Sequence, residues 1–232
     1  MNIAVISDIH SNCFALKAVL DDLENYNINN LIILGDIFGY YPWSVETYNL
    51  LQPYLGKAYC IKGNHDDLLL NTIAPNPCPS YWYAAKQNEE ELKRHAPEAI
   101  EWLETLDFNK TITIGGSNIR MFHGTPGDPK NGRYYPDDRK NYDWDFKTDE
   151  TILLGHTHYP MYKELKGYKI YNPGSVGQPR DGNPMPSWGI FDLENDLFKF
   201  VRTRYDNLHV IEKLYEIKWD EKSILSLNKK KQ

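Results

Sequence analysis

The first residues with chemical potential follow the apolar run at positions 3–6, where Asp8 and His10 stand two positions apart. Four apolar residues in a row are typical of a core strand. A carboxylate and an imidazole at the end of such a strand are costly unless something compensates them. Alternate residues of an extended chain point to the same side. We therefore expect Asp8 and His10 to face one point, which solvent, a substrate or a metal would occupy.

The same arrangement, an apolar strand-like run followed by polar residues, recurs along the chain. The further residues of this kind are Asp36, Asn64, His65, His123, His156 and His158. Five of the seven histidines thus follow predicted strands, whereas His95 and His209 lie on predicted helices. Ordinary core polar groups would each need a buried partner at the same sheet edge. A shared metal site explains the set better.

The ligand types indicate which metals would bind. Oxygen and imidazole ligands without thiolate suit Mn, Fe, Ni or Zn. One carboxylate, Asp36, can bridge two cations that lie roughly 3.5–4 Å apart. Asp8 and Asp36 carry a charge of about −2 against about +4 from two divalent cations, so the site keeps a positive excess that suits a phosphate and lowers the pKa of a bridging water. We predict two divalent metal ions, with manganese as the first choice.

Alternating strands and helices must position these side chains. The first 70 residues read strand, helix, strand, helix, strand, which predicts a parallel sheet with crossover helices. Ligands of such sheets bind at the carboxyl ends of the strands. The later half is rich in strands and hairpins, with turns at 115–118 and 194–197. We expect one α/β domain (α+β in some schemes) over residues 1–218, with two packed mixed sheets flanked by helices, and a C-terminal tail at 219–232.

The motifs "DIH", "GD", "GNHD", "HG" and "GHTH", in this order and spacing, resemble the calcineurin-like metallophosphoesterase superfamily and span residues 8–158. The stretches "GDIFGYYPWSVETYNLL" and "NPGSVGQPRDG" resemble its small bacterial and archaeal phosphodiesterase-like branch, which extends the resemblance to near residue 190. The resemblance implies a four-layer fold of two β-sheets packed face to face with helices outside.

The resemblance also implies a role for each of these polar residues. His65 would lie over the scissile phosphate, stabilise the transition state and protonate the leaving oxygen, as an imidazole that titrates near neutral pH can do. Asp36 would bridge the metals. The remaining implied ligands are Asp8, His10 and His158 for the first metal and Asn64, His123 and His156 for the second.

One departure separates the chain from the phosphoprotein phosphatases of the superfamily, which resemble it but carry Asp and Arg after the bridging aspartate in a GDxxDRG pattern. Here Gly39 and Tyr40 occupy those positions. An Asp partner for the catalytic histidine and an Arg for the phosphate are therefore absent from them, which argues against a Ser/Thr protein phosphatase. Tyr41 stands where the small branch would have glycine, and we expect its ring to narrow the entrance.

The succession of predicted strands and helices is interrupted twice, at residues 74–98 and 125–148. We interpret both segments as rim insertions that serve as lids, substrate walls or solvated connections. Arg180 is a candidate phosphate contact, with a surface salt bridge as the alternative. Arg133 is a candidate for a second phosphate or a base, with a solvated loop position as the alternative. The Tyr-Trp-Tyr run at 81–83 could stack a nucleobase, although packing of the rim is favoured.

Composition excludes several classes of partner. A formal net charge of −6 over 232 residues argues against a long nucleic acid as main partner, because binding to the phosphate backbone needs a basic face. No apolar stretch approaches the roughly 20 residues of a membrane helix, and no secretory signal is recognised. Three cysteines without a CxxC pair predict reduced thiols in a cytoplasmic protein. Exposed strand edges would permit a homodimer.

These observations predict a phosphodiesterase that hydrolyses a small phosphodiester or nucleotide through a water bridging two metals, with His65 as general acid. A second hypothesis is hydrolysis of dinucleoside polyphosphates or phosphomonoesters at the same site. A third is a non-catalytic binding or scaffold protein of the same fold. The presence of all seven implied ligands and His65 argues against the third.

Overall fold

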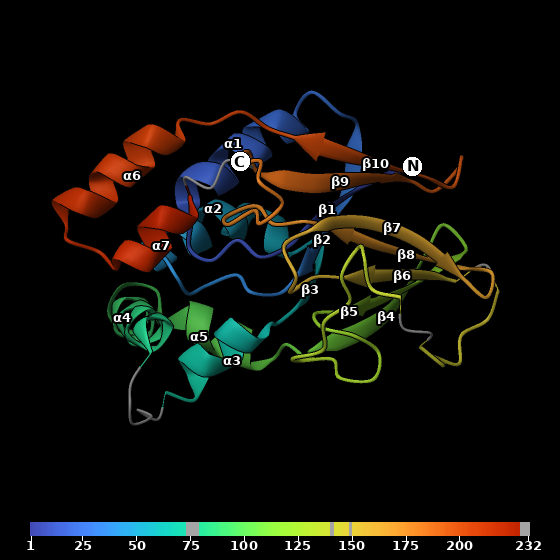
Figure 1. Cartoon of the computed structure of the whole chain (residues 1–232), viewed down its shortest axis with the longest axis horizontal. Helices are drawn as coiled ribbons and strands as arrows, with labels where there is room; N and C mark the ends of the chain where they lie inside the picture. Colours follow the sequence, from blue (N-terminus) through green and yellow to red (C-terminus); the bar gives the residue numbers. More distant parts are fainter. Residues whose placement is uncertain (73–78, 140–141, 149, 228–232) are drawn as a thin grey trace.

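Two five-stranded mixed β-sheets pack face to face, and helices cover the outer face of the first sheet (Figure 1). This architecture confirms the predicted fold class. The computed structural model describes residues 1–72, 79–139, 142–148 and 150–227.

The first sheet has the strand order β10-β9-β1-β2-β3. Its strands are β1 (Asn2–Ile6), β2 (Ile28–Leu34), β3 (Ala58–Ile61), β9 (Ser187–Asp192) and β10 (Leu197–Arg202). Strands β1, β2 and β3 are parallel and are joined by helices α1 (Cys13–Leu23) and α2 (Ser44–Leu55). The alternation predicted for the N-terminal part of the chain is thereby confirmed.

The second sheet has the strand order β4-β5-β6-β8-β7. Its strands are β4 (Asn109–Ile114), β5 (Ser117–Phe122), β6 (Thr151–Leu154), β7 (Pro160–Leu165) and β8 (Tyr168–Pro173). The predicted hairpin is confirmed as β4–β5, which turns at Gly115 and Gly116. Strands β5, β6 and β8 are parallel. Their carboxyl ends, like those of β1 to β3, lead into the loops that carry the predicted site residues.

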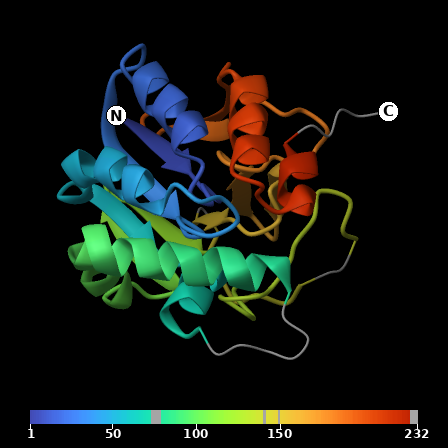
Figure 2. The ribbon, with the colours of Figure 1, turned by 90° about the vertical axis from the view of Figure 1, so that its left-hand side faces the viewer.

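Apolar side chains fill the space between the sheets and the space between the first sheet and its helices. Ile3 and Val5 of β1 face the second sheet, where they join Met121 and Leu153, whereas Ala4 and Ile6 face the helices. The alternation follows from the period-2 geometry of a strand. Figure 2 shows the helical layer from outside. The helices that pack on the first sheet are α1, α2, α4 (Ser80–His95) and α5 (Pro97–Glu104), with the short α3 (Asn64–Leu70) next to them, and the C-terminal helices are seen beside this layer.

The two predicted rim insertions have different positions. Of the segment 74–98, residues 73–78 lie outside the described part, and the rest is mainly α4, which contacts α2, α3 and α5. In the segment 125–148, an aromatic group packs on the outer face of the second sheet. This group, which consists of Tyr134, Tyr142, Trp144 and Phe146, covers Ile152, Leu154, Tyr168 and Ile170.

Helices α6 (Asn207–Glu216) and α7 (Glu221–Ser226) form a pair at the C-terminal end. Ile224 and Leu227, in the segment expected as a tail, are both 2% exposed and pack against α6 and against Tyr41. Their apolar side chains keep this segment on the domain. Tyr41 itself has no exposed surface, so the prediction that its ring narrows the entrance is wrong: the ring lies in this cluster.

The helices in the described ranges include none that is long and apolar enough to cross a membrane. Cys13 and Cys60 are free, buried thiols, and burial raises the pKa of each to about 12. Cys78 lies outside the described residues.

The interface between the sheets can be tested by a pair of leucine substitutions. Leu153 on β6 is fully buried between the sheets, so we expect Leu153→Ala to lower the free energy of unfolding by about 2–5 kcal/mol. Leu197 on β10 is 62% exposed, and Leu197→Ala should change it by no more than about 0.5 kcal/mol. Denaturant unfolding of both variants measures the difference. Equal effects would contradict a core between the sheets.

Candidate metal centre

The carboxyl ends of five strands meet at one edge of the two sheets. Asp8 follows β1, Asp36 follows β2, and Asn64 begins α3 shortly after β3. From the second sheet, His123 follows β5, and β6 leads to the remaining two histidines, His156 and His158. The structure therefore brings together all the polar residues singled out in the sequence, and His65 lies beside them with its ring 5.0 Å from that of His10.

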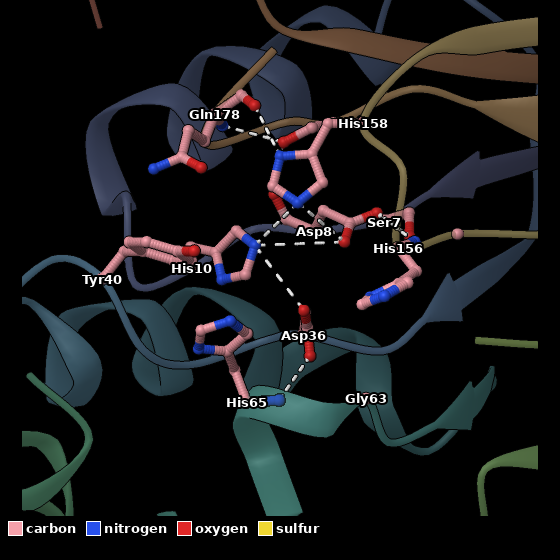
Figure 3. A network of polar contacts seen from close by, with 12 residues as sticks. Ser7, Asp8, His10, Asp36, Tyr40, Gly63, His65, His156, His158 and Gln178 are labelled. Carbon is pink, nitrogen blue, oxygen red and sulfur yellow. Dashed lines mark hydrogen bonds and ion pairs between the residues drawn. The ribbon is translucent and has the colours of Figure 1, made fainter. Parts of the chain in front are cut away.

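The first cluster contains Asp8, His10, Asp36 and His158, all buried. Each offers one ligand atom, and these atoms lie within 4.8 Å of one another. The Nε2 atom of His158 is 3.3 Å from Asp8 Oδ1 and 3.2 Å from His10 Nε2. The distance from His10 Nε2 to Asp36 Oδ2 is 3.7 Å. Figure 3 shows these groups pointing toward one another. Such a convergence of acceptor atoms fits a cation.

The second cluster shares Asp36 with the first and adds His123 and His156. The Nε2 atom of His123 lies 3.4 Å from Asp36 Oδ2 and 3.1 Å from Asn64 Oδ1. The amide oxygen of Asn64 therefore faces the same point. Asp36 Oδ2 is the oxygen that faces both clusters.

Each carboxylate in the centre has one oxygen that the protein satisfies and one that it leaves open. Asp8 Oδ2 accepts hydrogen bonds from the Ser7 hydroxyl at 2.6 Å and the His156 N–H at 3.1 Å. Asp36 Oδ1 accepts one from the His65 N–H at 2.8 Å. The other oxygens, Asp8 Oδ1 and Asp36 Oδ2, are buried and have no hydrogen-bond partner within the described residues. A bound cation would satisfy both oxygens.

Two imidazoles likewise have one ring nitrogen bound to the protein and the other directed into the clusters. The Nδ1 of His123 lies 2.8 Å from the Leu34 carbonyl oxygen, and the Nδ1 of His158 lies 2.6 Å from the Gln178 carbonyl oxygen. A carbonyl only accepts, so both Nδ1 atoms donate, and in the neutral rings both Nε2 lone pairs point into the clusters. His156 Nε2 is buried without a hydrogen-bond partner in the described part of the chain. The donor set therefore fits metal ions.

Burial and neighbouring charges shift the pKa values in this centre. Burial lowers the pKa of His10 well below its ordinary value. Burial, together with the positive charge of His123, lowers the pKa of His156 to about 4. For His123 itself burial is again the largest single effect and lowers the pKa, but the contributions of Asp36, Asp8 and the Leu34 carbonyl together outweigh it and raise the pKa to about 9. A cation that binds His123 must therefore displace a proton from it.

Several of these residues adopt a left-handed backbone, which is costly for most residues other than glycine, although Asp and His adopt it more often than the rest. The φ angle is positive at Asp8, His10, Asp36, His156 and His158. Each such residue costs roughly 1–2 kcal/mol, and strain of this kind concentrates at functional sites. The loops are also tightly packed. A Cβ atom at Gly63 would lie 2.1 Å from Asp36 Oδ1, so only glycine fits there.

Two buried polar residues support the site, and the sequence analysis did not single them out. Asp66 accepts hydrogen bonds from the backbone N–H groups of Ile37, Phe38 and Gly63 at 2.8–3.2 Å. It thereby ties the loop after Asp36 to the start of α3. Burial and then the charge of Asp36 raise the pKa of Asp66 to about 7. The acidic residue that ends the motif "GNHD" was the available indication in the sequence.

Asn88 on α4 is the second supporting residue and is fully buried. Its Oδ1 accepts from the Ser11 hydroxyl at 2.5 Å and from the Gly39 N–H at 3.1 Å, and its Nδ2 donates to the Tyr41 carbonyl at 2.9 Å. It links the loops after β1 and β2. No pattern in the sequence distinguishes this asparagine from an exposed helix residue.

The candidate substrate contacts lie around the rim. Arg180 is exposed, and its Nη2 donates to Gln178 Oε1 at 2.9 Å and to Tyr40 Oη at 3.4 Å. Arg133 is also exposed, and its positive charge contributes, after burial and His123, to the low pKa of His156. Tyr81 on α4 is 42% exposed, with its ring 5.8 Å from that of His65.

Comparisons with known proteins agree with this geometry. A sequence model described as the calcineurin-like phosphoesterase superfamily domain matches residues 1–196. MJ0912 of Methanocaldococcus jannaschii, named an uncharacterized protein, is 34% identical over 92% of this chain and 90% of its own length. Phosphodiesterase YfcE of Escherichia coli (strain K12) is 24% identical over 87% of this chain and 91% of its own. A metallophosphoesterase structure from Sphaerobacter thermophilus is 27% identical, covers 99% of both chains and superposes with a TM-score of 0.78.

Two packed mixed sheets with a buried cluster of carboxylates and imidazoles at one edge define the protein as a metal-dependent phosphoric ester hydrolase. The chain belongs to the calcineurin-like phosphoesterase superfamily. The resemblance noted in its sequence motifs is thereby confirmed.

The role of Asp66 can be tested against its neighbour. Asp66→Asn replaces one of the two accepting oxygens by an amide N–H₂, which then faces the Ile37 N–H and the N–H of Gly63 or Phe38, so we expect a loss of about 1–3 kcal/mol in the free energy of unfolding. Because the loop that carries Asp36 loosens, metal affinity should fall about 10- to 100-fold. Denaturant unfolding and calorimetric titration with Mn²⁺ measure the two effects.

The matched control is Asp67→Asn, one residue further along α3. Asp67 is partly exposed and pairs with Lys130 and Asn71, and such pairs contribute about 0–1 kcal/mol. If the two variants had the same stability and the same metal affinity, Asp66 would have no special role in the centre.

Proposed function

We propose that this protein is a dinuclear-metal phosphodiesterase that hydrolyses a small phosphodiester or a nucleotide. The observation that carries the proposal is the position of Asp36 Oδ2, a buried oxygen that has no hydrogen-bond partner among the described residues and faces two clusters of ligand atoms at once. A carboxylate in that position suits a bridge between two cations. The name of the relative YfcE, a phosphodiesterase, agrees with the reaction.

In this proposal, Asp36 contributes to both cation sites. The other ligands are Asp8, His10 and His158 for one site and Asn64, His123 and His156 for the other. Mixed oxygen and imidazole ligands make manganese the first metal to test, with iron, nickel and zinc as alternatives. When bound, two such cations would neutralise phosphoryl charge and make a water more acidic.

The side chains of the protein have the remaining tasks. His65 is the second residue of α3, is 8% exposed and has its backbone N–H bound to Asp36 Oδ1, so its ring lies next to both clusters. From there its imidazole protonates the leaving oxygen of the ester. The buried walls exclude bulk water, which strengthens every electrostatic interaction with the phosphate.

Arg180 and Arg133 are the proposed contacts to the rest of the substrate. Both are exposed. Their positive charges contribute to the lowered pKa values of His65 and His156 respectively, after larger effects of burial and neighbouring groups, so each lies close enough to the centre to influence it. A substrate with a second phosphate could use them both.

The catalytic assignment is tested by Asp36→Asn and His65→Ala. We expect Asp36→Asn to lose bound metal, measured as metal content by mass spectrometry, and to lose hydrolysis. His65→Ala should keep its metal but lose about 10²- to 10⁴-fold in kcat on a dialkyl phosphodiester.

His95→Ala is a control for the histidine, because His95 is exposed at the end of α4 and its removal should leave kcat unchanged. Asp67→Asn is the control for the aspartate. Normal turnover in either Asp36→Asn or His65→Ala would refute the assignment.

The arginines are tested by Arg180→Gln and Arg133→Gln. Losing one charge-assisted hydrogen bond to a phosphate should raise KM about tenfold and leave kcat nearly unchanged. Arg204→Gln, an exposed arginine after β10, is the control. If KM were unchanged in both variants for phosphodiesters, dinucleoside polyphosphates and phosphomonoesters, the two arginines would belong to the solvated surface.

A substrate panel separates the related reactions. The panel contains phosphodiesters, dinucleoside polyphosphates and phosphomonoesters. Each would place one phosphate at the metals, but they differ in the groups attached to that phosphate, which the rim of the site must accommodate. Preference for polyphosphates would replace the diesterase proposal by the second hypothesis, and no turnover of any class by metal-loaded protein would favour a scaffold. The cytoplasmic location, the absence of a long nucleic acid as partner and the homodimer stay predictions from the sequence.

A further inference from the structure

No polar side chain or backbone group in the described part of the chain orients the imidazole ring of His65. Its ring nitrogen Nδ1 is buried and has no hydrogen-bond partner within the described residues. Gly39 adjoins the ring from one side, where a Cβ atom would lie 3.2 Å from His65 Cβ and 3.3 Å from Nδ1. A carboxylate at position 39 is therefore unavailable to this ring, and packing must hold it.

Tyr40 supplies that packing. Its ring centroid lies 4.6 Å from that of His65 at an interplanar angle of 37°, and 4.7 Å from that of His10 at 86°. The side chain lies beside His10 and His65 in Figure 3. Its φ angle of 51° is in the left-handed region, which is costly for an aromatic residue. The surrounding structure must therefore stabilise this conformation.

The C-terminal helix pair, residues 207–227, provides stabilising contacts to the backbone of Tyr40 and to the neighbouring Tyr41. The indole Nε1 of Trp219, between α6 and α7, donates to the Tyr40 carbonyl oxygen at 2.7 Å. The next residue, Tyr41, is buried against α6 and α7, and its hydroxyl lies 3.0 Å from Ser226 Oγ. The superfamily model matches the chain as far as residue 196, so Trp219 and Ser226, which make these contacts, lie outside the matched part.

We propose that Tyr40 is a positioning residue for His65, and that the C-terminal helix pair holds Tyr40 in place. The ring of Tyr40 restricts rotation of an imidazole whose Nδ1 has no polar partner among the described residues, and it thereby directs the imidazole toward the leaving oxygen. This inference rests on the proposed role of His65 in protonating that oxygen. It gives the C-terminal helices a part in the reaction although they contribute no group to the metal centre.

The kinetic test uses two phosphodiesters with different leaving groups. An alkoxide must be protonated as it leaves, whereas a 4-nitrophenolate leaves readily without a proton. We expect Tyr40→Leu to lower kcat on a dialkyl diester about tenfold or more, as part of the general-acid contribution is lost. On bis(4-nitrophenyl) phosphate kcat should change less than about threefold, and KM should be nearly unchanged for both esters.

Three further variants separate positioning from general damage. Tyr40→Phe keeps the ring and should keep the ratio of the two kcat values of the unsubstituted protein; loss of the hydroxyl that accepts from Arg180 should act on KM alone, equally for both esters. Trp219→Phe removes the hydrogen bond to the Tyr40 carbonyl and should change the ratio of the two kcat values in the same direction as Tyr40→Leu. Tyr54→Leu is the matched control, because Tyr54 is 36% exposed on α2, away from the centre, and it should change neither rate.

A second readout does not depend on activity. Histidine ring signals in ¹H–¹³C spectra of the full chain with Zn²⁺, which is diamagnetic, report the ring current of Tyr40. We expect Tyr40→Leu to move the signals of His65 and His10 and to leave those of His95 and His209 in place. The spectra of Tyr40→Phe should resemble those of the unsubstituted protein, and Trp219→Phe should move the His65 signal.

The outcomes distinguish this inference from the proposed function. If the unsubstituted protein hydrolysed neither ester, the proposed function would fail, and the inferred role of Tyr40 with it. If it hydrolysed both and Tyr40→Leu reduced both rates equally, or neither, the function would stand and the positioning role would be overturned. A Trp219→Phe variant with unchanged rates and spectra would overturn the part assigned to the helix pair.

Discussion

The rest of the structure depends on how one buried carboxylate is held. Asp36 lies at the end of β2 with one oxygen bound to the His65 N–H and the other unpaired between two clusters of ligand atoms. A buried charge is tolerated only if the protein or a ligand compensates it. Here the backbone compensates one oxygen and leaves the second for a cation. The same hydrogen bond fixes His65 at the edge of the centre, so the position of the candidate acid and the position of the metals are one constraint.

The fold meets this constraint by packing loops tightly against one another. The carboxyl ends of strands from both sheets meet at one edge, and the loops that leave them adopt left-handed backbone at residues such as Asp8 and His156. Gly63 and Asp66 let the loop after Asp36 approach α3 and bind it. Several kcal/mol of strain and desolvation are thereby offset by the rigid two-sheet core. Hydrogen bonds and close loop packing hold the ligand atoms in place, and such preorganisation is what electrostatic catalysis on a phosphate requires.

Local patterns were sufficient for much of the fold and for the residues of the centre. The apolar run before Asp8 and the "GHTH" after β6 are short-range features, and the order strand–helix–strand constrains where such ends can meet. The positions of the Tyr40 and Tyr41 rings could not be predicted from local patterns. Which of the two rings faces His65 depends on the backbone conformation at Tyr40 and on helices that lie far along the chain. The same distance explains why Asn88, on a helix of ordinary composition, was not recognised as a link between two site loops.

By itself, the sequence determined the class of fold and predicted the residues of the candidate metal centre, because strand periodicity and ligand type are properties of neighbouring residues. The tertiary structure alone decided which oxygen of Asp8 and of Asp36 remains open, since this depends on donors such as Ser7 and His65 that reach it through packing. It also decided that the C-terminal helices adjoin Tyr40. Long-range packing of apolar side chains such as Ile224 sets that arrangement, and no short segment encodes it.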